Sequence, residues 1–321
     1  MSKSNNFAIW TLVIGSVLSI FVVSATAYLA LRPSTFEDDS NVIMKCPRDP
    51  NSAAEVFVSH HIAPNLLVGK FVIKVASCAG HRLKFGEYHL PPNVSIWRAI
   101  GIISSGHQVV HKFCIPEGLS VAETIEKLNN DKYLQGEVTE IPAEGSLLPA
   151  TYNFNYPTTR QEIIKKAEAA MRRFLNDAWQ QKSPDCFLET PEQVVTLASI
   201  VEKESPGVQL NKIAGMYLSR LSKKMRLQAD PTVLYGLYKG VKNGKKLTYA
   251  DLKDQSPYNT YVHSNLPPTP IANPGKAAIL AVLHPALTGD LFMYYDMRTM
   301  RSPVFAKTFQ EHRKNIAKFR K

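Results

Sequence analysis

The chain has 321 residues, of which 45% are hydrophobic and 20% charged. This composition is that of a folded protein with one or two domains, and it excludes a disordered chain. The net charge of +11 is concentrated in residues 201–321, which carry 20 Lys and Arg against 8 Asp and Glu. Such a basic half attracts a polyanion, an anionic membrane surface or a carboxylate-bearing polymer, unless it is simply a solvated surface. No nucleic-acid motif occurs, so nucleic acid is not predicted as a partner.

Residues 7–31 form a run of 25 positions without a charge. A helix needs about 20 apolar residues to cross a bilayer, so the run predicts a single transmembrane anchor. The alternative is a cleaved signal peptide, because Ala25-Thr26-Ala27 resembles a cleavage site. We favour the anchor, since the run is longer than an h-region of about 7–15 residues. Basic residues on the two sides of the run do not decide its orientation.

Four cysteines, Cys46, Cys78, Cys114 and Cys186, follow the predicted anchor without any C-x-x-C spacing. This spacing argues against a metal site, and no cofactor is predicted. Four cysteines allow three disulfide connectivities in an oxidising compartment, and four free thiols are the other alternative. We predict no specific pair.

The next predicted parts are a polar tether over residues 32–55 and a small α+β unit over residues 56–135. Within this unit we expect strands at residues 71–75, 85–90 and 107–115, and a helix from Ile96 that ends near Gly106. Ser120 followed by Glu123 has the spacing of a capping box and predicts the start of another helix. The unit contains no acid/base pair, so binding or spacing suits it better than catalysis.

A helix with one packing face is predicted for residues 158–181, and a second one lies between Pro191 and Pro206. The second helix has a buried stripe that ends in a carboxylate, and its members are Val194, Leu197, Ile200, Val201 and Glu204. Pro206 predicts that the helix ends near Ser205. Glu204 therefore points inward at the C-terminal end of the helix.

Burial and the negative end of the helix dipole both favour the protonated form of Glu204. A proton held near neutral pH is what a general acid needs. Glu202 lies about 200° away around the helix, so the two carboxylates do not form one catalytic pair. The alternative for Glu204 is an ordinary buried ion pair with a distant Arg.

After a further helix at residues 211–224, three loop-like segments are predicted at residues 227–232, 256–261 and 266–275. They are rich in amides, hydroxyls and aromatic rings, which are the groups that bind sugars. Proline, Asn, Asp and Gly also favour turns for backbone reasons alone. Three such segments downstream of one buried acid nevertheless favour a sugar site.

Five motifs in this order resemble the YceG-like family of peptidoglycan lytic transglycosylases. They are residues 197–204, 225–232, 258–261, 266–268 and 271–275, and Phe85-Gly86-Glu87-Tyr88 and Pro116-Glu117-Gly118 look like the family's LysM-like unit. The resemblance implies an α+β fold with a transmembrane helix in residues 1–31, a LysM-like unit in residues 56–135 and a mixed α/β catalytic domain in residues 136–321. It also implies a single-pass protein of the cell inner membrane with its body in the periplasm. The implied partners are peptidoglycan glycan strands, the membrane and peptidoglycan synthases.

By the same resemblance, Glu204 is the catalytic residue of an endolytic enzyme. It would protonate the MurNAc–GlcNAc glycosidic oxygen and then act as base while the muramic 6-hydroxyl closes onto C1, which gives 1,6-anhydro ends without consuming water. The expected substrate-binding residues are Gln228, Asp230, Tyr258, Asn259, Tyr261 and Asn273. Asp230 is equally well explained as the cap of a turn.

The chain departs from the family pattern at two places. Ala150 replaces an Asp in Pro149-Ala150-Thr151-Tyr152, and a segment around Pro303 replaces a Gly-Gly-His stretch. These departures keep open a non-catalytic cell-wall scaffold that binds glycan strands or a synthase. A third hypothesis is a hydrolase that uses Asp230 as a second carboxylate.

Overall fold

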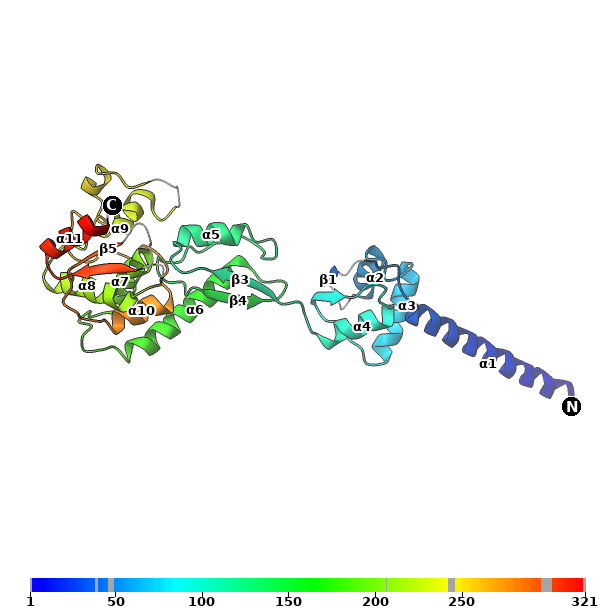
Figure 1. Ribbon diagram of the computed structural model, residues 1–321. Coiled ribbons are helices and arrows are strands. Elements are labelled where there is room, and N and C mark those ends of the chain that lie inside the picture. Colours follow the sequence, from blue (N-terminus) through cyan, green and yellow to red (C-terminus); the bar gives the residue numbers. More distant parts are fainter. Residues whose placement is uncertain are drawn as a thin grey trace. The chain divides into compact units, whose positions relative to one another are not determined.

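The computed structural model describes residues 2–37, 40–45, 49–205, 207–241, 246–295 and 302–319, without the side chains of residues 2–9 and 319 (Figure 1). The chain forms two compact units. We call Met1–His111 with Phe154–Pro157 the N-terminal unit, and Lys112–Asn153 with Thr158–Lys321 the C-terminal unit.

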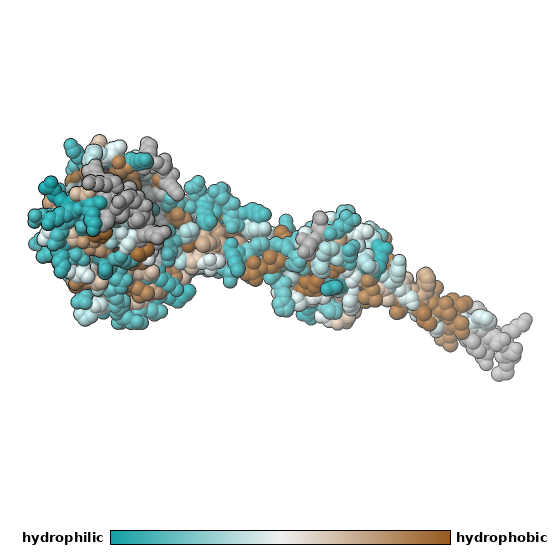
Figure 2. Space-filling model, in the orientation of Figure 1, coloured by the Kyte–Doolittle hydropathy of each residue, from teal (hydrophilic) through white to brown (hydrophobic). Residues whose placement is uncertain are grey.

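The first element is the helix α1, Ser2–Leu31. Its part Trp10–Leu31 is long and apolar enough to cross a membrane, with a mean hydropathy of 2.2, and its apolar side chains are exposed (Figure 2). The predicted helix is confirmed. Its length and composition fit a membrane anchor and a signal sequence near the N-terminus equally well.

The rest of the N-terminal unit packs helices on a two-stranded antiparallel sheet. Strand β1 pairs with strand β2 in a register that sets Val42 opposite Tyr88, and both side chains are fully buried. The elements are β1 (Ser40–Met44), α2 (Pro50–Ser59), α3 (Leu66–Cys78), β2 (Gly86–Leu90) and α4 (Ile96–Ser105). The predicted helix end at Gly106 is confirmed, because this glycine adopts the left-handed conformation at φ 80°.

Two predictions for this region were wrong. Residues 71–75 are not a strand but lie inside α3, since Asn65 caps a helix whose buried residues recur with a period of three to four. A short run of branched residues fits a strand and a buried helix equally well. The tether predicted for residues 32–55 contains β1 and the first half of α2, so most of it belongs to the folded unit.

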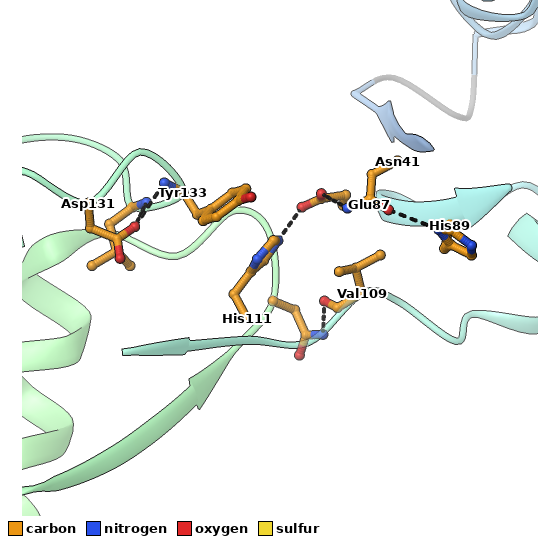
Figure 3. A network of polar contacts seen from close by, with 9 residues as sticks. Asn41, Glu87, His89, Val109, His111, Asp131 and Tyr133 are labelled. Carbon is orange, nitrogen blue, oxygen red and sulfur yellow. Dashed lines mark hydrogen bonds and ion pairs between the residues drawn. The ribbon is translucent and has the colours of Figure 1, made fainter. Parts of the chain in front are cut away.

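A buried carboxylate ties the strands of the N-terminal unit together (Figure 3). Glu87 on β2 is 4% exposed, and it accepts hydrogen bonds from Asn41 Nδ2 at 2.8 Å and from His111 Nε2 at 2.6 Å. The Asn41 side-chain oxygen lies 3.2 Å from Nδ1 of His89. Because buried polar groups need partners, this network fixes the pairing of β1 with β2.

The C-terminal unit is mainly helical. Its core forms where α7 and α8 pack with α10 around Leu197, Ile200 and Leu218. The helices are α5 (Val121–Asn129), α6 (Arg160–Trp179), α7 (Pro191–Glu204), α8 (Leu210–Ser222), α9 (Asp230–Tyr238), the short 3₁₀ helix η1 (Asp251–Lys253), α10 (Lys276–Leu283) and α11 (Phe309–Phe319). The strands are β3 (His111–Ile115) with β4 (Ala150–Phe154), and β5 (Phe292–Tyr295) with β6 (Pro303–Ala306).

The division into units differs from the predicted boundary at residue 135, because the C-terminal unit begins at Lys112. The segment around Gly118 therefore belongs with the C-terminal unit, where the Gly118 N–H donates to the carbonyl of Asn273 at 2.9 Å. The capping box at Ser120 and Glu123 is confirmed. Of the two departures from the family pattern, Ala150 begins β4, and Pro303 begins β6 opposite Tyr295.

Three of the four cysteines lie in the described part of the chain. Cys78 and Cys114 are exposed free thiols, and Cys186 is a buried free thiol. Cys46 lies outside the described residues.

Candidate active site

The helix α7 ends in Glu204, as predicted. Thr190 and Gln193 form a capping box at its start, and Pro191 occupies the first turn, where proline costs no hydrogen bond. The predicted apolar stripe is fully buried. Ser205 has an extended backbone and ends the helix, while Pro206 lies outside the described residues.

Glu204 is a partly exposed residue whose carboxyl has a raised pKa. Burial and then the negative charge of Asp230 raise the pKa of Glu204 to about 7, whereas a hydrogen bond from Tyr217 and the charge of Arg220 oppose the shift. The ion pairs seen in the described part of the chain join other residues. Glu204 is thus not the ordinary buried ion pair, and its carboxyl is placed to give and take a proton at neutral pH.

Tyr217 and Arg220 reach Glu204 from α8. They lie three positions apart on one face of this helix, and both are buried. The Arg220 guanidinium donates to the carbonyls of Leu291 at 2.6 Å and Leu227 at 2.8 Å, and to Oε1 of Gln228 at 3.2 Å. Arg220 therefore fixes the segment that leads from α8 to α9.

Gln228 and Asp230 are exposed at the start of α9. Gln228 has a left-handed backbone at φ 53°, and its N–H donates to the carbonyl of Thr260 at 3.1 Å. Asp230 accepts a short hydrogen bond of 2.6 Å from the hydroxyl of Tyr261. Asp230 and Tyr261 thus lie close enough to Glu204 to act on it electrostatically, and Gln228 is held by Arg220.

The segment at residues 227–232 is not entirely a loop. Asp230 is the first residue of α9, with Pro231 in its first turn, so the expected turn is a helix start. A carboxylate is favourable at this position because the N-terminal end of a helix dipole is positive. Asp230 therefore has a structural role in addition to its charge on Glu204.

Tyr258 belongs to a different group of side chains. Its ring packs on Tyr235 with centroids 4.9 Å apart, and its hydroxyl lies 2.9 Å from that of Thr269. The Tyr235 hydroxyl donates to Glu144 at 3.1 Å, and burial raises the pKa of Glu144. No described contact joins Tyr258 to Glu204.

Asn259 and Asn273 are wholly buried, and their role in sugar binding stays a prediction. Asn259 donates to the carbonyls of Leu252 and Asp254 and accepts from the N–H of Tyr261. Asn273 donates to the carbonyl of Leu119 at 2.9 Å and accepts from the N–H of Leu147 at 3.0 Å. These amides hold loops in place, and Asn259 holds the backbone of Tyr261 by accepting its N–H at 2.9 Å.

Glu202 is a structural neighbour of the site, as predicted. It accepts a hydrogen bond of 2.9 Å from the N–H of Gly275, which caps α10, and burial raises its pKa. A Cβ on Gly275 would lie 1.9 Å from Oε1 of the exposed Glu117, so a larger residue at position 275 would displace this side chain. This arrangement anchors the loop at residues 271–275.

Sequence reasoning missed three side chains around the acid. Tyr217 and Arg220 were not singled out in the helix predicted at residues 211–224. The third is Tyr295 on β5, whose hydroxyl donates to the backbone carbonyl of Glu204 at 2.7 Å. The one available signal was the pair of polar side chains at Tyr217 and Arg220, which share the inward face of a predicted helix. Tyr295 gave no signal, because its contact depends on the tertiary fold.

A pocket of about 500 Å³ opens beside the first turns of α7, at the other end of this helix from Glu204. Its lining includes Phe187, Glu192, Thr196 and Pro267, so the predicted loop at residues 266–275 contributes to it. Within the described ranges, no three His, Cys, Asp or Glu side chains are grouped closely enough to hold a metal ion.

Known proteins resemble the chain over most of its length. It is 38% identical to an endolytic murein transglycosylase of Bacillus subtilis over 179 residues, which are 56% of this chain and 48% of that protein. It is 28% identical to an endolytic murein transglycosylase of Streptococcus pneumoniae over 224 residues, which are 63% of this chain and 39% of that protein. The chain thus spans about half, or less, of the length of the curated relatives it matches.

A solved structure agrees with these relatives. The crystal structure of a yceG-like protein from Listeria monocytogenes is 27% identical, with a TM-score of 0.51, and the match covers 87% of this chain and 99% of that one. The profile of the YceG-like family matches residues 51–318, which include the N-terminal unit from α2 onward and the whole Glu204 site. The chain therefore belongs to the YceG-like family.

Proposed function

We propose that the chain is a membrane-anchored endolytic lytic transglycosylase that cleaves the MurNAc–GlcNAc bond of nascent peptidoglycan. The relatives from Bacillus and Streptococcus carry the name endolytic murein transglycosylase. The observation that carries the proposal is the partly exposed Glu204, whose pKa is raised to about 7. A carboxyl with a pKa near the working pH can donate a proton as an acid, and its carboxylate can then accept a proton as a base.

In the first step, the Glu204 carboxyl donates its proton to the glycosidic oxygen, and the bond from C1 to this oxygen breaks. The positive charge that develops at C1 is stabilised by the carboxylate of Asp230, which the Tyr261 hydroxyl holds in place at 2.6 Å. The exposed amide of Gln228 contributes a hydrogen bond to the sugar.

In the second step, the ionised Glu204 takes the proton of the muramic 6-hydroxyl, whose oxygen then bonds to C1. One C–O bond is broken and one is formed, and the proton returns to Glu204, so no water is consumed. The products are a 1,6-anhydro-MurNAc end and a new GlcNAc 4-hydroxyl. One carboxyl performs both proton transfers, because the acceptor hydroxyl belongs to the substrate itself.

The helix α1 would anchor this activity in the cell inner membrane, with both units in the periplasm. Its 22-residue segment Trp10–Leu31 matches the roughly 20 residues needed to cross a bilayer. In this position the enzyme meets glycan strands as synthases release them, so peptidoglycan synthases are proposed partners. We also propose that the βααβ part of the N-terminal unit is the LysM-like module and that it binds or spaces the glycan.

The test is to incubate the full chain in detergent with purified glycan strands and to identify the products by mass spectrometry. Wild type is expected to give anhydro ends, and Glu204→Gln is expected to give none. Glu192→Gln is the matched control, because Glu192 lies on the same helix but at its exposed start. Undiminished anhydro product from Glu204→Gln would refute the proposal, and a wild type that binds strands without cutting them would favour the scaffold.

A second candidate is hydrolysis with Asp230 as the second carboxylate. The observation in its favour is that the charge of Asp230 acts directly on Glu204. Hydrolysis gives reducing ends, which are heavier than anhydro ends by one water. The same mass spectra therefore separate the two reactions.

A further inference from the structure

The outward face of α3 carries an apolar stripe that no other described element covers. Leu67 is 80% exposed, Phe71 45% and Val75 37%, and their spacing of four residues puts them on one side of the helix. The opposite side of α3 is buried in the core of the N-terminal unit through Gly69, Val72, Ile73 and Ala76. Large apolar side chains gathered on a surface mark an interaction site.

The helix α3, which carries this stripe, packs against α1. The helix α1 contacts both α3 and α4 (Figure 1), and Ala30 is only 5% exposed. Four residues near the end of α1, Ala25, Thr26, Leu29 and Ala30, are partly or fully covered, whereas positions 10–24 are exposed. In Figure 2, apolar residues cover α1 up to the place where it joins the rest of the unit.

The length of α1 brings the bilayer up to α3. Residues 7–24 are the uncharged positions that precede the covered end of α1, and these 18 residues span about 27 Å as a helix. The hydrocarbon core of a bilayer is about 30 Å thick. No free stretch of helix is therefore left between the hydrocarbon and the point where α3 meets α1.

The charges around the stripe suit a lipid surface. The sequence of α3 contains Lys70 and Lys74 and no acidic residue. Arg32 directly follows α1. Lysine and arginine side chains lay their stems along apolar surface and raise the charged head to the phosphate level, which is the pattern of helices that lie in a membrane interface.

We propose that α3 lies in the interface of the membrane that α1 crosses, with Leu67, Phe71 and Val75 among the acyl chains. Lys70 and Lys74 then pair with the head groups of anionic phospholipids. This inference rests on the proposed anchor α1 and adds a second membrane contact to it. The contact orients the N-terminal unit on the bilayer instead of leaving it free on a flexible stalk.

The test uses the full chain in vesicles of phosphatidylcholine and phosphatidylglycerol whose acyl chains are brominated near the head group. Bromine quenches tryptophan only at contact depth. Phe71→Trp and Leu67→Trp place the probe on the stripe. Val110→Trp is the matched control, because Val110 is a 55% exposed apolar residue of the same unit outside α3.

The expected result is a loss of the added emission for Phe71→Trp and Leu67→Trp and none for Val110→Trp. The loss should be smaller without phosphatidylglycerol, and an equal loss would refute the pairing of the lysines with anionic lipid. In a chain whose Trp97 and Trp179 are replaced by Phe, Trp10 reports separately on α1, where it is 65% exposed. A quenched Trp10 with both stripe probes unquenched overturns the α3 contact alone, whereas an unquenched Trp10 overturns the anchor and this contact together.

Discussion

Replacing Glu204 with Gln is expected to stabilise the C-terminal unit increasingly as the pH rises, although it removes the proposed acid. The native environment raises the pKa of this carboxyl from 4.5 to about 7. Below pH 4.5 both the folded and the unfolded chain are protonated, so ionisation has no effect on stability. Between these two values the unfolded chain loses the proton first, and the folded state is progressively disfavoured.

The full effect above pH 7 is about 3 kcal/mol, since one pKa unit corresponds to about 1.4 kcal/mol. Wild type should lose this much stability, relative to Glu204→Gln, between about pH 4.5 and pH 7.5. Hydrogen exchange of the α7 and α8 amides, measured at several pH values on both full-length chains, gives the opening free energies. All other titrating groups cancel in the difference between the two chains. A difference that stays constant with pH would refute the burial argument for Glu204.

Three further substitutions test the surroundings of the acid. Asp230→Asn removes a charge that raises the pKa of Glu204, so the alkaline limb of kcat/KM should move to lower pH. Tyr217→Phe removes a hydrogen bond that lowers this pKa, so the limb should move to higher pH, and shifts in the same direction for both variants would contradict the assignment. Asn273→Ala leaves the buried N–H of Leu147 without its partner, while the carbonyl of Leu119 keeps its bond of 2.8 Å from the backbone N–H of residue 273. The free energy of unfolding should fall by about 2 kcal/mol in urea titrations, whereas a loss below about 0.5 kcal/mol would show that this side chain does not stabilise the fold.

The acid could be located from sequence because helix geometry is local. Four apolar positions and a helix stop at Pro206 are enough to place Glu204 on the inward face at the end of α7. Gln228 and Tyr261 were expected only through the resemblance to the YceG-like family, and their role in sugar binding stays a prediction. The bounds of α7 in the structure agree with this reasoning.

The remaining features needed the tertiary fold. Residue type alone cannot distinguish a sugar-binding amide from one that supports a loop, and in the structure the side chains of Asn259 and Asn273 are buried and support loops. The partnership of Tyr217 with Glu204 depends on how α7 packs on α8. In α3, the branched residues of positions 71–75 suggested a strand, because the helix cap at Asn65 lies outside such a short window.

The hydrogen bonds of Arg220 limit how this protein can be re-engineered. Its guanidinium donates to the carbonyl of Leu227, which precedes α9 in the chain, to the carbonyl of Leu291, which follows it, and to the side-chain oxygen of Gln228. A lysine could not replace it, because an ammonium group has fewer donors and lacks the planar arrangement of a guanidinium. The segment that presents Gln228 and Asp230 is therefore not an independent module. Exchanging it between relatives to alter specificity should succeed only when the arginine of α8 and the residues around Leu291 are transferred with it.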